Sequence, residues 1–412
     1  MTVSSQPGLL RPLGHLERMF WLKNQHMPYH FAIAAEIAGP TTIAAWRAAF
    51  EAVRRRHPNF SVKIASDETG APCFYHVPGV PIPLRIVTTD QRWESEMERE
   101  LATPFDATKA PLVRAVLLVR PSRTFLILAA HHSIADTKSL VFAIRDALQA
   151  MAGPAPEPLP PIGSLDSWLE RFRTAPRCDA SGQGSFPAPA TLDVYRKPDG
   201  TLPSIGSLSL TSSLTGAIRR RSREEDTTVH GALVAAAAAA ARELSPVLKR
   251  VPISIGSAVD YRNAVGAGED VALLSAGGSI AAEHQMRNFW DLARFAKRSI
   301  EPVRSPEAMS VMSAGLGRYF SVDRDERDVG ALMAGFRFDI NISNLGSLAI
   351  ETRFGERCIE RLWGPSILAG FEGEQEIGAS TLNGSLSLLH TSYKPLPAFL
   401  PHIEKQLAAA CM

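Results

Sequence analysis

Apolar residues recur along the first half of the chain at the spacings of helices and strands. Ile43, Trp46, Phe50 and Val53 follow a helical period, and Thr41 or Thr42 before them can cap the helix. Residues 124–130 are an apolar run of the length typical of a buried strand. The same reasoning predicts further helices over residues 13–22, 94–103 and 140–151, and strands over residues 29–37, 62–64, 73–77 and 112–119.

The second half continues the mixture. The pattern predicts strands over residues 206–210, 251–257, 338–343, 366–371, 376–382 and 385–393, and helices over residues 213–222 and 397–410, with another starting at Thr227 or Thr228. Asn383-Gly384 is typical of a two-residue hairpin turn. Long helices mixed with many strands predict an α/β (α+β) fold arranged in two lobes.

Two stretches rich in proline, glycine and serine divide the chain. Residues 153–161 hold five prolines and are expected to run extended, and residues 174–205 stay poor in periodic pattern. We therefore expect an N-terminal lobe over residues 1–173, a crossing linker over residues 174–205, and a C-terminal lobe over residues 206–412.

Composition and charge narrow the classes of partner. The chain has 412 residues, 45% of them hydrophobic, and 44 Lys and Arg against 42 Asp and Glu give a net charge of +2. This balance gives no electrostatic reason to expect nucleic acid or an anionic membrane as the main partner. The longest nearly pure apolar run, residues 231–241, is too short to span a bilayer, and no signal peptide is visible at the start. We expect a soluble cytoplasmic protein without an integral membrane segment.

The four cysteines are scattered and form no CxxC pair. The sequence therefore predicts neither a zinc knuckle nor a dithiol redox site. We expect no bound metal and no bound redox cofactor.

The candidate chemistry lies in the run His131-His132-Ser133-Ile134-Ala135-Asp136, directly after the predicted strand over residues 124–130. Imidazole has a pKa near 6.5, so a small shift prepares it to accept a proton at neutral pH. Adjacent residues of a strand point to opposite faces, so the two histidines could not easily share a metal ion. One working and one structural histidine fit this geometry, although two ordinary histidines remain an alternative on this run alone.

The run resembles the HHxxxDG signature of the chloramphenicol-acetyltransferase-like superfamily. That superfamily includes condensation domains of nonribosomal peptide synthetases, plant BAHD acyltransferases and polyketide-associated acyltransferases of the mycobacterial phthiocerol type. Five further segments resemble superfamily motifs in the same order, namely residues 12–21, 56–58, 104–114, 259–262 ("VDxR") and 342–346 ("SNLG"). Thr228-Val229-His230 resembles the start of the first long helix of the second lobe.

The resemblance implies two similar lobes, each a mixed sheet with flanking helices, that meet at a solvent channel. It implies an acyltransferase with His132 as general base and no acyl-enzyme, in which an alcohol or amine attacks an acyl thioester. His131 and Asp136 would hold the loop, and Arg262 is the best candidate partner of Asp136. Ser343, Asn344 and Thr137 are candidates for the oxyanion site or the channel wall.

The donor would be an acyl thioester of coenzyme A or of a phosphopantetheine-bearing carrier protein, used as substrate and not as a bound cofactor. The acceptor would be a small alcohol or amine, and we expect a monomer. The chain resembles free-standing polyketide-associated enzymes most, in a setting of secondary-metabolite biosynthesis.

One position departs from the signature, because Thr137 stands where the signature has glycine. A β-branched residue disfavours positive φ and adds bulk beside the site. Two alternatives stay open. One is a free-standing condensation enzyme that forms an amide between carrier-bound substrates and would use the same residues. The other, which rests on Thr137, is a non-catalytic binding or scaffold member of the same fold. A serine hydrolase is disfavoured, because the chain has no G-x-S-x-G elbow.

Overall fold

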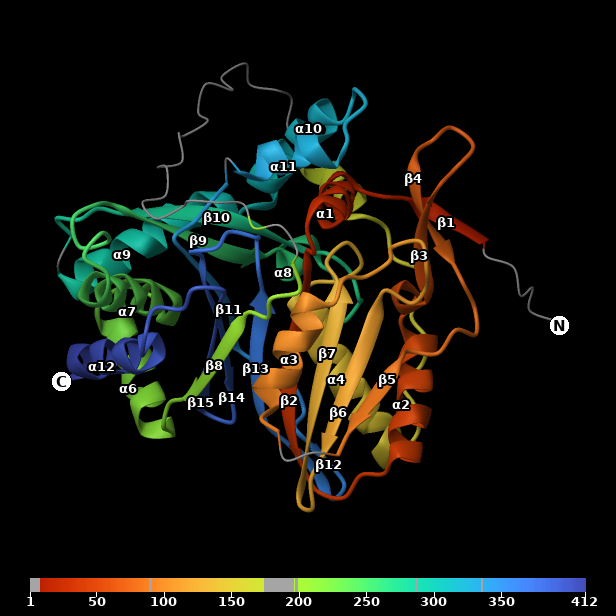
Figure 1. Cartoon of the computed structure of the whole chain (residues 1–412), viewed down its shortest axis with the longest axis horizontal. Helices are drawn as coiled ribbons and strands as arrows, with labels where there is room; N and C mark the ends of the chain where they lie inside the picture. The colour runs from red at the N-terminus through yellow and green to blue at the C-terminus, as the bar shows by residue number, and fades with distance from the viewer. Residues whose placement is uncertain (1–7, 89–90, 174–195, 197–198, 287, 335) are drawn as a thin grey trace.

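The computed structural model describes residues 8–412, except for residues 89–90, 174–195, 197–198, 287 and 335. Two six-stranded sheets lie side by side, each with helices on its faces, and a three-stranded sheet stands at the outer edge of the first (Figure 1). This arrangement confirms the predicted α/β class with two sheet-containing lobes.

The first large sheet has the strand order β12-β13-β2-β7-β6-β5. Its strands are β2 (His30–Ala38), β5 (Leu84–Val87), β6 (Val113–Val119), β7 (Arg123–His131), β12 (Arg353–Phe354) and β13 (Arg357–Ile367). Every neighbouring pair is antiparallel except β5 with β6. Because side chains alternate along a strand, Phe31 and Ile33 of β2 pack on one face while Ala32 and Ala34 pack on the other.

Helices cover both faces of this sheet. On one face lie α2 (Ile43–Arg56) and α4 (Thr137–Ala152), whose apolar sides enter the same core as Phe31. On the other face lies α3 (Trp93–Ala102), which packs with Ala32. The side chain of Thr42 caps α2 by accepting from the Ala45 N–H at 3.1 Å, as the sequence predicted.

The small sheet has the order β1-β4-β3. It consists of β1 (Gly8–Pro12), β3 (Val62–Ser66) and β4 (Pro72–His76), and the short helix η1 (Pro58–Ser61) precedes β3.

The second large sheet has the order β10-β9-β11-β14-β15-β8. Its strands are β8 (Ser204–Ser209), β9 (Ile253–Asp260), β10 (Ser275–Ala282), β11 (Ile340–Ser347), β14 (Gln375–Leu382) and β15 (Ser385–Ser392). Asn383 and Gly384, which join β14 to β15, have φ values of 50° and 78°. Both are positive, as the predicted turn requires.

One face of the second sheet is covered by four helices (Figure 1). These are α6 (Ser212–Glu224), α7 (Val229–Leu244), α9 (Phe289–Ile300) and α12 (Phe399–Cys411). The alanine run of α7 is buried except at Ala239, because its small side chains allow close approach to the sheet and neighbouring helices. The remaining helices are α1 (His15–His26), α5 (Leu165–Leu169), η2 (Glu170–Phe172), α8 (Arg262–Val265), η3 (Glu301–Arg304), α10 (Pro306–Tyr319) and α11 (Glu326–Ala334).

The two halves of the chain exchange elements. Leu16, Met19 and Phe20 of α1 belong to the core of the second sheet, and β12 and β13 extend the first sheet although they come from the second half. The predicted strand over residues 366–371 is wrong: β13 ends at Ile367 and pairs with β2 in the other sheet. The boundaries expected at residues 173 and 206 stay a prediction, and most of the expected linker lies outside the described residues.

Candidate active site

The histidine run forms the turn between a buried strand and a helix. Strand β7 ends at His131, and α4 begins at Thr137. Asp136 caps α4, since its Oδ1 accepts from the Ser139 N–H at 2.9 Å. His132 is thus held on a five-residue turn that is anchored at both ends by regular structure.

His132 is half-buried, and one of its two ring nitrogens is fixed. Nδ1 donates to the carbonyl oxygen of Ala135 at 3.1 Å, because a carbonyl can only accept. Nε2 is then the unprotonated nitrogen of the neutral ring. Burial lowers the pKa of His132 below its usual value, so the ring is neutral at neutral pH and able to accept a proton at Nε2.

Aromatic rings surround this imidazole. The ring centroids of Phe20, Phe31 and Tyr29 lie 4.7, 4.8 and 5.6 Å from that of His132. Tyr29 is stacked on the ring, and burial raises its own pKa above the usual range, so its hydroxyl stays protonated. The apolar surroundings explain why His132 favours the neutral form.

His131 points into the protein and is fully buried. Its Nδ1 accepts from the Ser133 N–H at 3.1 Å, and burial lowers its pKa to about 3. The side chain of Ser133 donates to the carbonyl of Glu17 at 2.9 Å, which ties the same turn to α1. The opposite directions of the two histidines agree with the strand geometry that the sequence suggested.

Asp136 and Arg262 form a buried ion pair. Arg262 Nη2 lies 3.1 Å from both carboxylate oxygens of Asp136, and both side chains are almost fully buried. Arg262 Nη1 donates to the carbonyls of Gly268 and Asp270 at 3.0 and 2.7 Å. This is the partner that the sequence suggested for Asp136, and the pair joins the two halves of the chain.

The loop after Arg262 docks directly on the turn. The Asp136 N–H donates to Ala272 O at 3.0 Å, and the Leu274 N–H donates to Asp136 Oδ2 at 3.2 Å. Asn59 donates to the carbonyls of Ile134 and Val271 at 3.3 and 2.8 Å. Backbone and side-chain bonds together make the turn rigid.

A cavity of about 450 Å³ opens beside the turn. Its walls combine the start of α4 with β9, β11, the start of α7 and the end of α9. Thr137, Ser343 and Asn344 were the candidates for the oxyanion site or the channel wall. Although Thr137 is far from the other two in the sequence, all three line this cavity. His132 is not in its wall, but precedes the lining residues Asp136 and Thr137 in the same turn.

Thr137 is the first residue of α4 and has no positive φ. The backbone at this position therefore does not need glycine, and the threonine side chain adds bulk only to the cavity wall. Asn344 Oδ1 accepts from the Gly346 N–H at 2.9 Å, within β11 where its pairing with β14 shifts register.

Sequence reasoning missed several residues of this region. Lys138, Asp260 and Arg304 line the cavity, and Lys138 Nζ donates to Asp260 at 2.6 Å. Phe20 lies in the segment over residues 12–21 that resembles a superfamily motif, but neither this segment nor Tyr29 gave a signal of contact with His132. The structure also puts His230, at the start of α7, in the cavity wall with Nε2 2.9 Å from Ser257 Oγ.

Two ionisable side chains, Lys23 and Glu374, are buried near Tyr29. Lys23 is fully buried, and burial lowers its pKa to about 7. Burial raises the pKa of Glu374 to about 7, although its carboxylate accepts from the N–H groups of Ala369, Gly370 and Phe371 at 3.0, 2.8 and 3.2 Å. These three hydrogen bonds fix the backbone of the loop that precedes β14.

Within the residues that the structure describes, no three His, Cys, Asp or Glu side chains are grouped so as to hold a metal ion. The described helices include none that is long and apolar enough to cross a membrane.

Comparison with known proteins gives a consistent picture. Residues 199–286 match the family model described as phthiocerol/phthiodiolone dimycocerosyl transferase C-terminus. The structure of polyketide synthase associated protein 5 from Mycobacterium tuberculosis has a TM-score of 0.66 at 18% identity and covers 98% of both chains. The first condensation domain of the CDA synthetase has a TM-score of 0.73 at 17% identity, over 98% of this chain and 96% of that one.

The chain has the fold of polyketide synthase associated protein 5 and of this condensation domain. The structure of TRI3 trichothecene 15-O-acetyltransferase from Fusarium sporotrichioides has a TM-score of 0.70 at 12% identity over 100% of this chain and 97% of that one. A plipastatin synthase protein of Bacillus subtilis (strain 168) is 29% identical over 119 residues, which are 29% of this chain and 5% of that protein. The fold is thus shared by an acetyltransferase and by a condensation domain. The chain matches only a small part of the synthase.

Proposed function

We propose that the protein is an acyltransferase that moves an acyl group from a coenzyme A or carrier-protein thioester to a hydroxyl or amine, with His132 as general base. The observation that supports the proposal most is the protonation of His132. Its Nδ1 is fixed by the Ala135 carbonyl, and burial keeps the ring neutral with Nε2 unprotonated. A neutral imidazole in a rigid turn is suited to proton transfer.

The proposed reaction has two steps and no acyl-enzyme. Nε2 of His132 takes the proton from the acceptor O–H or N–H while the acceptor atom bonds to the thioester carbonyl carbon. The tetrahedral oxyanion then collapses, the C–S bond breaks, and the leaving thiolate takes the proton back from His132. Catalysis rests on proton transfer and on positioning of the two substrates.

The cavity supports the proposal by its place and its chemistry. Ser343 offers a hydroxyl group and Asn344 an amide in its wall, and Thr137 adds bulk there, next to the turn that carries His132. Groups of this kind can hydrogen-bond a pantetheine amide or a developing oxyanion. The rigid links from Asp136 to Arg262 would keep this wall and His132 in a constant relation.

A condensation enzyme that forms amides between carrier-bound substrates is the second candidate. It is favoured by the similarity to condensation domains over 98% of the chain and by the match to plipastatin synthase. The non-catalytic alternative rested on Thr137, and it loses support because the backbone there adopts an ordinary helical start.

The experiment that tests the proposal measures thiol release from acyl-coenzyme A and acyl-pantetheine donors with mixed alcohol and amine acceptors. Release that depends on the acceptor is the expected result, and product mass separates an ester from an amide. Absence of release across the panel, carrier-bound donors included, would contradict the proposal.

A further inference from the structure

His30 lies opposite His131 in the sheet, outside the motif. The two residues are register partners on the antiparallel strands β2 and β7. Partners of this kind project from the same face with their Cβ atoms about 4.5–5.5 Å apart. Both side chains are buried, and Phe105 packs edge-on against both rings, with centroids 5.3 and 6.4 Å away.

The hydrogen bonds of the two rings assign their tautomers. Nδ1 of His131 accepts from the Ser133 N–H, so the proton of this neutral ring is on Nε2. Nε2 of His30 donates to the carbonyl of Glu100 at 2.8 Å, so Nδ1 of His30 carries the lone pair. Burial lowers the pKa of His30 to about 4 and that of His131 to about 3, so both rings are neutral at neutral pH.

The two nitrogens left over are complementary. Nε2–H of His131 is a buried donor and Nδ1 of His30 is a buried acceptor, and neither has a hydrogen-bond partner among the described residues. Buried polar groups in folded proteins are nearly always paired with protein or with ordered water. This rule indicates that the unpaired donor of His131 and the unpaired acceptor of His30, on register partners, share one hydrogen-bonding partner.

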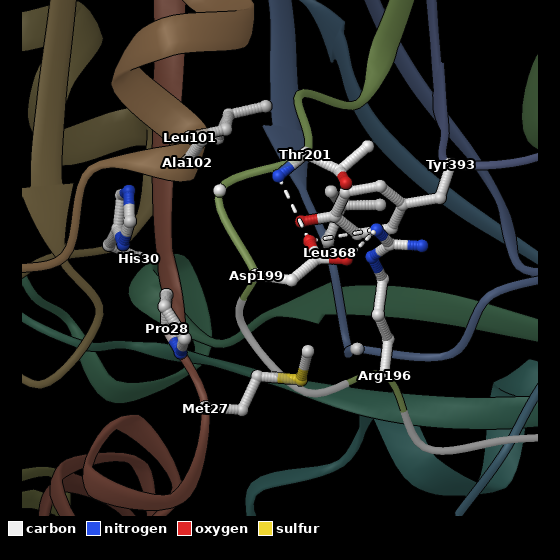
Figure 2. A pocket seen from close by; sticks show the side chains of 12 residues that line it. Met27, Pro28, His30, Leu101, Ala102, Arg196, Asp199, Thr201, Leu368 and Tyr393 are labelled. Carbon is white, nitrogen blue, oxygen red and sulfur yellow. Dashed lines mark hydrogen bonds and ion pairs between the residues drawn. The ribbon is translucent and has the colours of Figure 1, made fainter.

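A small cavity lies beside His30. It has a volume of about 30 Å³, and its walls include His30, Met27, Leu101, Arg196 and Tyr393 but not His131 (Figure 2). A space of this size accommodates a water molecule.

We propose that one bound water joins Nε2–H of His131 to Nδ1 of His30, and that His30 is a positioning residue for His132. The chain of bonds runs from the Glu100 carbonyl through His30, the water and His131 to the Ser133 N–H. It holds the turn in which the Ala135 carbonyl fixes Nδ1 of His132. The role in catalysis rests on the proposed function, whereas the chain of bonds does not.

The first test uses the wild-type protein without substrate. Long-range ¹⁵N NMR of the imidazole rings at pH 7 is expected to show both His30 and His131 as Nε2–H tautomers, with the His131 Nε2–H proton slow to exchange. An Nδ1–H tautomer at either ring, or a His131 proton that exchanges as fast as that of an exposed histidine, would overturn the proposal. The result does not depend on finding the right acyl donor.

The second test uses three variants. His30→Phe fills the site but removes donor and acceptor, His30→Gln keeps one of each, and Phe105→Leu is the matched control that changes packing on both rings without removing a polar partner. His30→Phe is expected to lower kcat by about tenfold or more with KM unchanged, because misplaced catalytic groups lose rate strongly. It should also make the His132 ¹⁵N signals report mixed tautomers.

His30→Gln is expected to recover kcat to within about threefold of wild type, and Phe105→Leu to stay within the same range. Equal losses in His30→Phe and Phe105→Leu would mean that packing alone matters and would overturn the proposal. If His30→Phe does not fold, the wild-type NMR and the comparison of His30→Gln with Phe105→Leu still decide. If no variant and no wild type transfers an acyl group, the proposed function fails while the NMR result stands on its own.

Discussion

Arg262 Nη2 lies 3.1 Å from both carboxylate oxygens of Asp136, a residue 126 positions away in the chain. The pair is buried, and Asp136 also caps α4 and accepts from the Leu274 N–H. One side chain therefore joins the helix start, the loop from the second half and the turn of His132.

Removing Arg262 is expected to destabilise the protein strongly. Arg262→Ala leaves the Asp136 carboxylate buried without its cation, which typically costs about 3–5 kcal/mol. Arg262→Lys keeps the charge but loses the planar fork that also reaches the Gly268 and Asp270 carbonyls, so an intermediate loss is expected. Urea unfolding measures both, with Arg250→Ala as the exposed control. A loss below about 1 kcal/mol for Arg262→Ala would contradict this account of the pair.

The buried histidines predict how stability depends on pH. The pKa of His30 is about 4 in the folded protein and near 6.5 unfolded, so the unfolded chain binds more protons between these values. Stability is therefore fully present above pH 6.5 and falls as the pH drops toward 4, by about 3 kcal/mol from this residue. His30→Gln should flatten the dependence, whereas the exposed control His284→Gln should not. Equal slopes for His30→Gln and wild type in urea unfolding from pH 4 to 7 would refute the prediction.

Glycine at position 378 allows the two sheets to approach. A Cβ there would overlap the carbonyl oxygen of Pro365 on β13. Gly378→Ala is expected to lower the free energy of unfolding by about 1–3 kcal/mol or more through overpacking. Gly277→Ala on β10, where a Cβ meets open space, is the matched control. Similar melting temperatures for the two variants would show that the close approach is not strained by a methyl group.

Restoring glycine at position 137 is expected to matter little for catalysis. Because Thr137 begins α4 without a positive φ, Thr137→Gly should change kcat/KM by less than about threefold and cost about 0.5–1 kcal/mol of stability. Thr137→Ala separates loss of bulk from gain of flexibility. An increase of kcat/KM by more than tenfold in Thr137→Gly alone would show that the threonine backbone limits the site.

Local patterns predicted most elements of the fold. A threonine before residue 43 indicates a helix cap, and Asn383-Gly384 indicates a hairpin turn with positive φ values. The structure has both the helix start and the turn. The membership of β13 in the first sheet was beyond reach, since a strand of alternating pattern does not state which sheet it joins. Pairing with β2 is decided by contacts between segments more than 300 residues apart.

The site divides in the same way. His132, Asp136 and Arg262 lie in motifs, so their approach could be expected from the resemblance. Phe20 reaches His132 from α1, and Tyr29 reaches it from the residue before β2. A single aromatic residue in a sequence does not indicate which side chain it will contact. His30 became visible only when the register of β2 and β7 paired it with His131.

The central claim is that His132 accepts the proton of the attacking acceptor. Its most direct test is acceptor-dependent thiol release by wild type and by His132→Ala, with the exposed His284→Ala as control, under one set of acyl-thioester donors. The account predicts a rate about 10²–10⁴-fold lower for His132→Ala and an unchanged rate for the control. Equal acceptor-dependent release by wild type and His132→Ala would contradict it.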